Sequence, residues 1–318
     1  MHKVKTLKSK KAFSPYLYII PAAIIVILFR FIPILLSFIL SFFKWTIKGP
    51  EKLIGFANYY QLLNDTEFWQ SLTNTFYLVI FVVPITLILS LLFANLLNRT
   101  TKLSGLFRTT YFIPTVTSLV ALSIVWKLIF GSQSGLMNHI LGFFGIHGLG
   151  WLSESRGIFN MLFGAIGINI PKFLGGPSLA LFAIIIVSIW RSLGYNTIIF
   201  LAGLQNIPEV YYEAAEIDGA SKIKQFFKIT IPLISPTTFY VLIMTTIVTF
   251  QVFAQVYMMT GPPVGGPLGT TKVIVYYIFE KGIDAQEFSY ASAIALVLFF
   301  IILSLTMLQK KLEKKVQY

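Results

Sequence analysis

The feature that most constrains this chain is a series of long apolar runs separated by short polar segments. Runs longer than roughly 18 residues recur, and each is long enough to cross the hydrocarbon core of a bilayer as an α-helix. Charged residues make up only 12% of the 318 residues, about half the share of an ordinary soluble domain. The sequence therefore predicts an all-α integral membrane protein with six transmembrane helices. These spans lie at about 16–43, 72–97, 106–130, 178–203, 233–259 and 289–308.

The domain organisation follows from the same pattern. Residues 1–15 form a basic N-terminus, residues 16–308 form the membrane domain, and residues 309–318 form a basic tail. A polar loop at 204–232 interrupts the apolar pattern between the fourth and fifth spans. A cleaved signal peptide has a shorter apolar region than 16–43, so we expect the first span to be retained.

Basic residues are divided unevenly between the two sides of the membrane. Six spans place both termini and the polar loop on one side, which carries fifteen of the 25 Lys and Arg residues. The other side carries eight in longer loops, and two lie within spans. The positive-inside bias therefore predicts cytoplasmic termini in a cytoplasmic (inner) membrane. The net charge of +13 is a topology signal, so we expect the lipid bilayer and no nucleic acid as a partner.

The sequence shows no group of residues with the spacing of a catalytic or metal-binding site. Cysteine is absent, the three histidines are scattered, and no paired carboxylates share a span. We therefore expect no catalytic residue, no metal site and no bound cofactor in this chain. The chain also has no G-x-x-x-x-G-K-[ST] phosphate loop, so it cannot bind ATP by that route.

The polar loop predicts a short helix–turn–helix unit. Pro208 can occupy the first turn of a helix, and Gly219 is placed to end it, because a C-terminal cap residue often has positive φ. Ser221 can cap a second short helix. Ala214 and Ala215 leave a low-relief surface that another protein can approach closely. The pattern favours a docking element, and the alternative is an amphipathic helix lying on the membrane.

At this loop the sequence resembles the EAA motif of ABC-importer permeases. Glu213-Ala214-Ala215, Gly219 and Ile231-Pro232-Leu233 carry the resemblance. The sequence segments around this motif are similar to those of the carbohydrate-uptake branch, the relatives of the maltose and glycerol-3-phosphate permeases. These segments are Leu201 to Pro208, Ile217 to Ala220 and Phe226 to Leu233. The likeness is strongest from about residue 184 to the end of the chain.

The resemblance implies a type I importer permease fold with a cytoplasmic EAA coupling helix. It further implies a transport subunit that forms, with a second related permease, the path for a carbohydrate or related solute, such as a sugar, an oligosaccharide or glycerol-3-phosphate. Two copies of an ABC ATPase would hold ATP and Mg²⁺, and an external binding protein would deliver the solute. The resemblance assigns coupling to the ATPase to Tyr212, Glu213, Ala214, Ala215, Asp218 and Gly219.

Two polar bands within the fourth and fifth spans mark a possible solute path, because solute sites lie near mid-membrane where helices are polar or interrupted. In the maltose-type permease, stretches like Leu193-Gly194-Tyr195 and Phe250-Gln251 lie along the sugar site. The resemblance therefore assigns a lining role to Gly194, Tyr195, Phe250 and Gln251. The alternative is that these groups bond to neighbouring helices.

Other features leave alternatives open. Arg30 either has a functional role or faces a partner helix or a wet cavity. Arg191 either attracts a phosphate or carboxylate, or pairs with a helix terminus or a partner's carboxylate. The apolar piece 157–171 is short for a crossing and predicts an interfacial or protein-buried helix, within extra residues around 153–177 that have no assigned role. The alternative function is a secondary transporter or channel without an ATPase, which has no reason to carry an EAA element.

Overall fold

The structure is a computed structural model that describes residues 18–46, 49–99, 113–146, 148–171 and 174–316. Within these ranges its regular secondary structure is helical apart from a two-stranded hairpin, which confirms the predicted all-α class. The chain divides into two compact units. One comprises residues 1–64 and 278–297, and the other comprises residues 65–277 and 298–318.

The first unit begins with a continuous helix, Tyr18–Leu40. None of its most apolar window is buried, as expected for side chains that face lipid. A turn at Ser41 leads into the hairpin, and the Asn58 side-chain amide donates a hydrogen bond to the Ser41 carbonyl oxygen at 2.7 Å. The elements of this unit are the π-helical η1 (Ile27–Phe31), α2 (Ile32–Leu40), β1 (Phe43–Thr46), β2 (Gly49–Leu53), α3 (Ala57–Leu63), η5 (Glu280–Asp284) and the first part of α16 (Phe288–Val316).

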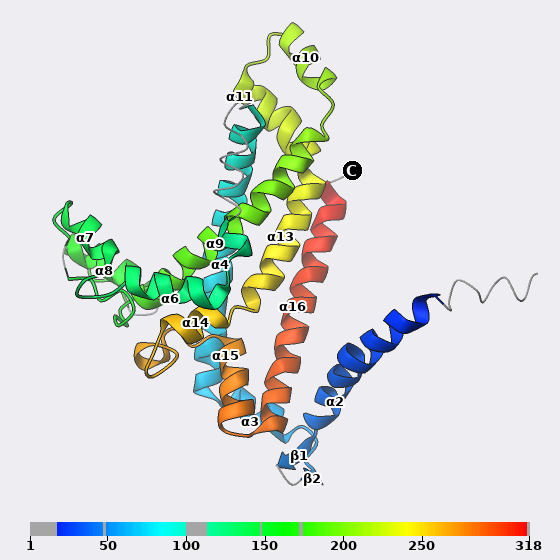
Figure 1. The fold of residues 1–318 in the computed structure, drawn as a ribbon, viewed down its shortest axis with the longest axis vertical. Coiled ribbons are helices and arrows are strands. Elements are labelled where there is room, and N and C mark those ends of the chain that lie inside the picture. The colour runs from blue at the N-terminus through cyan, green and yellow to red at the C-terminus, as the bar shows by residue number, and fades with distance from the viewer. Residues whose placement is uncertain (1–17, 47–48, 100–112, 147, 172–173, 317–318) are drawn as a thin grey trace, which may run out of the picture. The chain divides into compact units, whose positions relative to one another are not determined.

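The second unit is built around three long helices, α4 (Thr66–Arg99), α9 (Leu179–Gln205) and α13 (Ser235–Phe250). Helix α4 packs most extensively against α9, and α13 packs against both (Figure 1). Their contact is apolar because all three helices are rich in aliphatic side chains. One buried cluster consists of Ala94, Leu97, Phe200, Leu201, Leu204, Ile234 and Val241.

Shorter helices surround this bundle. The Thr260–Lys272 segment between α14 and α15 is held to α4 by the Asn74 side-chain amide, which donates to the carbonyl oxygens of Gly269 at 3.1 Å and Lys272 at 2.9 Å. The short helices are α6 (Leu119–Ile129), α7 (Leu136–Gly142), α8 (Ile158–Ala165), α14 (Ala254–Met259), η4 (Pro267–Gly269) and α15 (Ile274–Phe279).

The described helices agree with most of the predicted spans. Four of them are long and apolar enough to cross a membrane, and a fifth is formed if a bent pair is counted as one span. The four are Tyr18–Leu40, Thr66–Asn98, Leu179–Gln205 and Phe288–Lys315. Of the predicted span 106–130, residues 106–112 lie outside the described residues; the remainder is helical at 113–116 and in α6.

The predicted continuous span 233–259 is divided in the structure. Helix α13 ends at Phe250, a break follows at 251–253, and α14 starts at Ala254. The hydroxyls of Thr246 and Thr249 each donate to the carbonyl oxygen four residues back, at 2.7 Å, and such back-bonding bends a helix near its end. At its other end α13 meets the preceding helix, Lys222–Leu233, at 65°, with Pro236 in its first turn. Proline there removes a backbone donor and produces the kink.

The segment 157–171 does not cross a membrane in this structure. Its helix α8 has only eight residues. Backbone hydrogen bonds fasten α8 to the start of α9, from Ile158 N–H to the Pro177 carbonyl oxygen and from Leu179 N–H to the Arg156 carbonyl oxygen. The start of this segment is therefore held against the start of α9.

Candidate functional site

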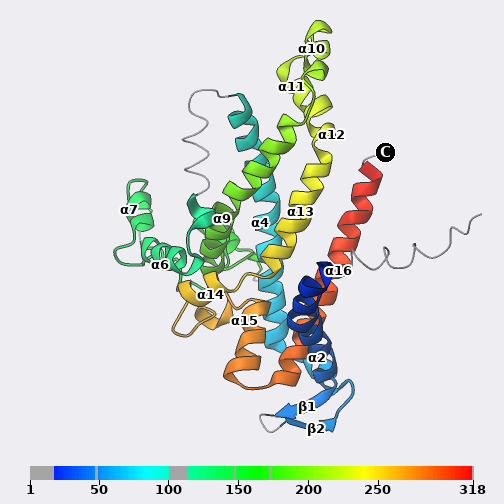
Figure 2. The same ribbon diagram turned by 45° about the vertical axis from the view of Figure 1, so that its right-hand side comes forward.

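The polar loop forms two short helical arms that lie beyond the ends of α9 and α13 (Figures 1 and 2). The first arm is α10 (Val210–Ile217), entered by a helical turn in which Tyr212 N–H donates to the Glu209 carbonyl oxygen at 2.8 Å. The second arm is the helix Lys222–Leu233, made of α11 (Lys222–Gln225), the π-helical η3 (Phe226–Thr230) and α12 (Ile231–Leu233). We call α10, the connecting turn and the second arm (Lys222–Leu233) the knob. The predicted helix–turn–helix is confirmed.

The turn between the two arms depends on Gly219. Its φ is +70°, a conformation that glycine adopts without steric penalty. Ala220 N–H donates to the Ala215 carbonyl oxygen at 2.8 Å, and Gly219 N–H donates to the Glu216 carbonyl oxygen at 3.0 Å. This pair of bonds is a Schellman motif, which satisfies carbonyl groups left open at a helix C-terminus. The motif ends α10 where the sequence predicted.

Side chains then fasten the second arm to the first. The Ser221 hydroxyl accepts the Lys224 backbone N–H at 3.3 Å, which is the predicted N-cap. Lys222 forms an ion pair with Glu216 across the turn. The Lys222 ammonium lowers the pKa of the Glu216 carboxyl, first by its hydrogen bond and then by its charge. The Gln225 side-chain amide donates to the Ala220 carbonyl oxygen at 3.2 Å.

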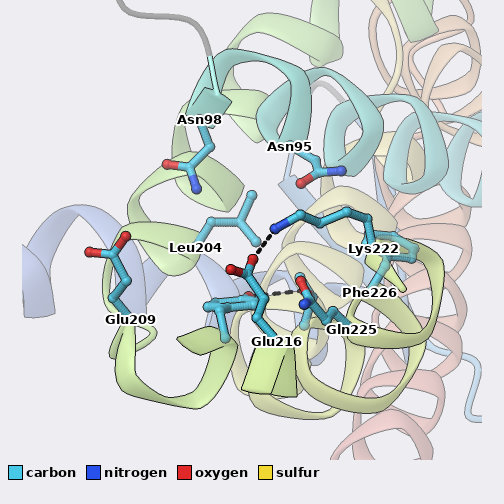
Figure 3. A pocket seen from close by; sticks show the side chains of 10 residues that line it. Asn95, Asn98, Leu204, Glu209, Glu216, Lys222, Gln225 and Phe226 are labelled. Atoms are coloured by element: carbon cyan, nitrogen blue, oxygen red, sulfur yellow. Dashed lines mark hydrogen bonds and ion pairs between the residues drawn. The ribbon is translucent and has the colours of Figure 1, made fainter. Parts of the chain in front are cut away.

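Beneath the knob lies a polar cavity of about 320 Å³ (Figure 3). It is bounded by the end of α4, the end of α9 and both arms of the loop. Tyr212 lines it and bonds through its hydroxyl to the Thr230 hydroxyl at 2.9 Å, which ties α10 to the second arm. The remaining lining residues are Asn95, Asn98, Leu204, Glu209, Glu216, Lys222, Gln225 and Phe226.

The outer surface of the knob is unexpectedly apolar for a polar loop. Ile217 is 87% exposed, Ile223 is 73% exposed and Phe227 is 62% exposed. Exposed apolar side chains grouped on a projecting element indicate an interaction surface. Sequence patterns did not single these three out, because isolated apolar residues in a loop are common.

The six residues predicted to couple to an ATPase all lie in α10 or its cap. Glu213, Ala214, Asp218 and Gly219 are exposed, whereas Ala215 is partly buried. Tyr212 is also partly buried, and its bond to Thr230 gives it a role in holding the knob together. The sequence did not predict the contributions of Thr230 or of the Glu216–Lys222 pair, because these depend on how the two arms fold against each other.

The four residues predicted to line a solute path do not share one cavity in this chain. Tyr195 is exposed and lines a cavity of about 160 Å³ between α9, α13 and residue 115. Gly194 is buried in α9, and Gln251 is exposed at the end of α13. Phe250 is fully buried and contacts Phe76 edge to face, with ring centroids 5.6 Å apart.

The Tyr195 cavity also contains polar groups that sequence analysis did not assign to the path. The Asn196 side-chain amide donates to the Thr245 hydroxyl at 3.1 Å and joins α9 to α13. The other lining residues are Thr115, Arg191, Ser192, Met244 and Val248. Among the described residues, no three His, Cys, Asp or Glu side chains gather where they could hold a metal ion.

Comparison with known proteins gives a consistent result. Residues 67–318 match the family model described as the binding-protein-dependent transport system inner membrane component. The chain is 35% identical to the probable ABC transporter permease protein YurN of Bacillus subtilis, with 94% of this chain and 96% of that protein covered. It is 34% identical to the arabinooligosaccharides transport system permease protein AraP of the same organism, with coverage of 96% and 90%.

Solved structures share the fold. One similar chain comes from a bacterial alginate ABC transporter in complex with an alginate pentasaccharide-bound periplasmic protein. The TM-score is 0.77 at 19% sequence identity, and 97% of this chain and 96% of that chain are covered. The arrangement of helices described above is therefore one already seen in an ABC transporter.

Proposed function

Because this chain belongs to the family of binding-protein-dependent transport system inner membrane components, we propose that it forms the path for a carbohydrate together with a second, related permease. The chain is a transmembrane transport subunit and not an enzyme. Carbohydrate as the solute is supported by relatives such as the arabinooligosaccharides permease. The family membership supports transport together with an ATPase over the alternative, a secondary transporter or channel without one.

The proposed partners extend this role. Two copies of an ABC ATPase bind ATP and Mg²⁺, since the chain has no phosphate loop of its own. An external binding protein delivers the solute, as the periplasmic protein seen with the alginate transporter suggests by analogy. The knob and both termini face the cytoplasm, which is the orientation that the distribution of Lys and Arg favours.

The observation that carries the proposal is the exposed apolar surface of the knob. Fully burying an isoleucine side chain contributes about 1.5–3 kcal/mol, so docking of Ile217 and Ile223 into an ATPase cleft would stabilise the complex substantially. The Schellman turn and the Tyr212–Thr230 bond hold α10 in a fixed position relative to α13. A movement of the ATPase is thereby transmitted to the span that follows the knob.

Cross-linking tests this assignment directly. The natural chain has no cysteine, so single-cysteine variants give an unambiguous signal. Ile217→Cys in native membranes should cross-link to the ATPase, and the yield should change when ATP and vanadate are added. Phe143→Cys is the matched control, because Phe143 is 89% exposed in a segment predicted to be external. No link from Ile217→Cys, or an equal link from Phe143→Cys, would contradict the docking role.

A further inference from the structure

Arg191 lies in the middle of α9 and lines the 160 Å³ cavity beside α13. It is twelve residues from the start of the helix and fourteen from the end. At 1.5 Å per residue, the nearer helix end is about 18 Å away. A charged arginine at this depth is expensive unless its charge is compensated.

This chain supplies no side-chain carboxylate to Arg191. All twelve acidic residues lie in the described part of the chain, and none occurs in α9, in α13 or at 113–129. The ion pairs of the described acidic residues go to other basic side chains. Within the described chain, no side-chain carboxylate therefore balances the charge of Arg191.

The cavity has unfilled hydrogen-bonding capacity. Among the described residues, Arg191 Nε and Thr115 Oγ1 are both buried and have no hydrogen-bond partner. Burying such groups without partners costs free energy that a bound ligand would restore. Most of the surface that lines the cavity is apolar, and the polar side chains among its eight lining residues surround one positive charge.

We propose that this cavity binds the anionic group of the solute, so that the imported carbohydrate carries a carboxylate, phosphate or sulfonate. The guanidinium would donate hydrogen bonds to two of its oxygen atoms in a bidentate arrangement, and the neighbouring hydroxyls would bond to sugar hydroxyl groups. This inference rests on the proposed function and adds the chemical class of the solute.

Protection of Arg191 from an arginine reagent provides a test that does not depend on transport. The complex of both permeases and the ATPase, in phosphatidylcholine nanodiscs, is treated with phenylglyoxal, and peptides containing Arg191 and Arg156 are compared by mass spectrometry. Tri-galacturonate should protect Arg191 at a concentration at least tenfold lower than neutral galactotriose does. Arg156 is exposed and paired with Glu154, so its reaction should depend on neither sugar.

Three results would overturn the inference. Equal protection by the two trisaccharides would mean that the cavity does not select an anion. If Arg191 reacts with phenylglyoxal in the isolated chain but not in the sugar-free complex, it is paired with a carboxylate of the second permease. Protection by added phosphatidylglycerol in place of sugar would assign the site to lipid.

Uptake by proteoliposomes separates this inference from the proposed function. Arg191→Gln should lower kcat/KM for the acidic sugar roughly 10- to 100-fold, the range expected for a charged hydrogen bond, while ATPase association stays unchanged. Arg191→Lys should retain part of the activity, and Arg156→Gln should behave as the natural protein does. If no sugar is taken up in an ATP-dependent way by the natural complex, the proposed function fails. If ATP-driven uptake is intact but Arg191→Gln affects acidic and neutral sugars equally, only the anion site fails.

Discussion

The substitution Gly219→Ala isolates the backbone requirement of the knob. Gly219 has φ +70°, and a Cβ added there would meet no atom within 4 Å. Loss of packing inside this chain therefore contributes nothing to the effect. The remaining cost of the substitution is the backbone strain of an L-residue in the left-handed region, roughly 1–2 kcal/mol. A penalty of that size changes the population of the intact turn by a factor of about 5–30.

A second glycine in the chain provides a matched control. Gly145 has φ +77° and open space around its Cβ position. It also ends a helix in a Schellman motif, in which Ile146 N–H donates to the Leu141 carbonyl oxygen at 3.1 Å and Gly145 N–H donates to the Gly142 carbonyl oxygen at 3.0 Å. Gly145→Ala therefore introduces the same strain in the segment that we place outside the membrane.

The assay measures how much ATPase co-purifies with the permease and how fast ATP drives uptake in proteoliposomes. Gly219→Ala should weaken ATPase association by about 5- to 30-fold without preventing membrane insertion, whereas Gly145→Ala should leave association unchanged. Gly219→Asn should be milder, because asparagine tolerates the left-handed region. Gly219→Asp should uncouple uptake, because it also places a charge on the docking surface. Equal losses from both alanine variants, or full coupling in Gly219→Ala, would refute the reasoning.

Three further predictions concern the spans and their orientation. Gln251→Leu should weaken uptake while assembly stays intact, because we propose that the Gln251 amide at the end of α13 bonds to sugar hydroxyls. If the variant takes up sugar as fast as the natural protein does, Gln251 does not line the solute path. Thr245→Val removes the bond between α13 and Asn196 and should lower the stability of the detergent-solubilised chain by about 0.6–2 kcal/mol, and an unchanged Tm would contradict this. A label at Tyr318 should react only from the cytoplasmic side, so labelling from outside intact cells would overturn the assigned topology.

Local features of the knob were predictable because local rules govern them. The positive φ of Gly219 and the N-cap at Ser221 each involve residues within one or two helical turns. Helix lengths were also predictable from the apolar runs, since the thickness of a bilayer sets a minimum length. The predicted span 178–203 differs from α9 by only a few residues at either end.

Features that depend on packing between distant segments were not predictable in this way. The resemblance placed Phe250 along the solute path, yet its ring is buried against Phe76 in the described chain. The sequence did not predict the break after Phe250, because an apolar run does not reveal where threonine hydroxyls donate to backbone carbonyl groups of the same helix. In α9, Arg191 could be recognised as unusual, but only the structure shows an unpartnered Nε beside a cavity between α9 and α13.

The sequence by itself determined that this chain lies in a membrane, roughly where most of its long helices lie, and that a capped helical loop separates two of them. These properties follow from hydrophobic run length and from bonds between neighbours in the chain. The tertiary structure decided which polar groups meet: Tyr212 with Thr230 below the knob, and Asn196 with Thr245 between α9 and α13. Their proximity is set by the packing of α4, α9 and α13, and no single helix carries that information.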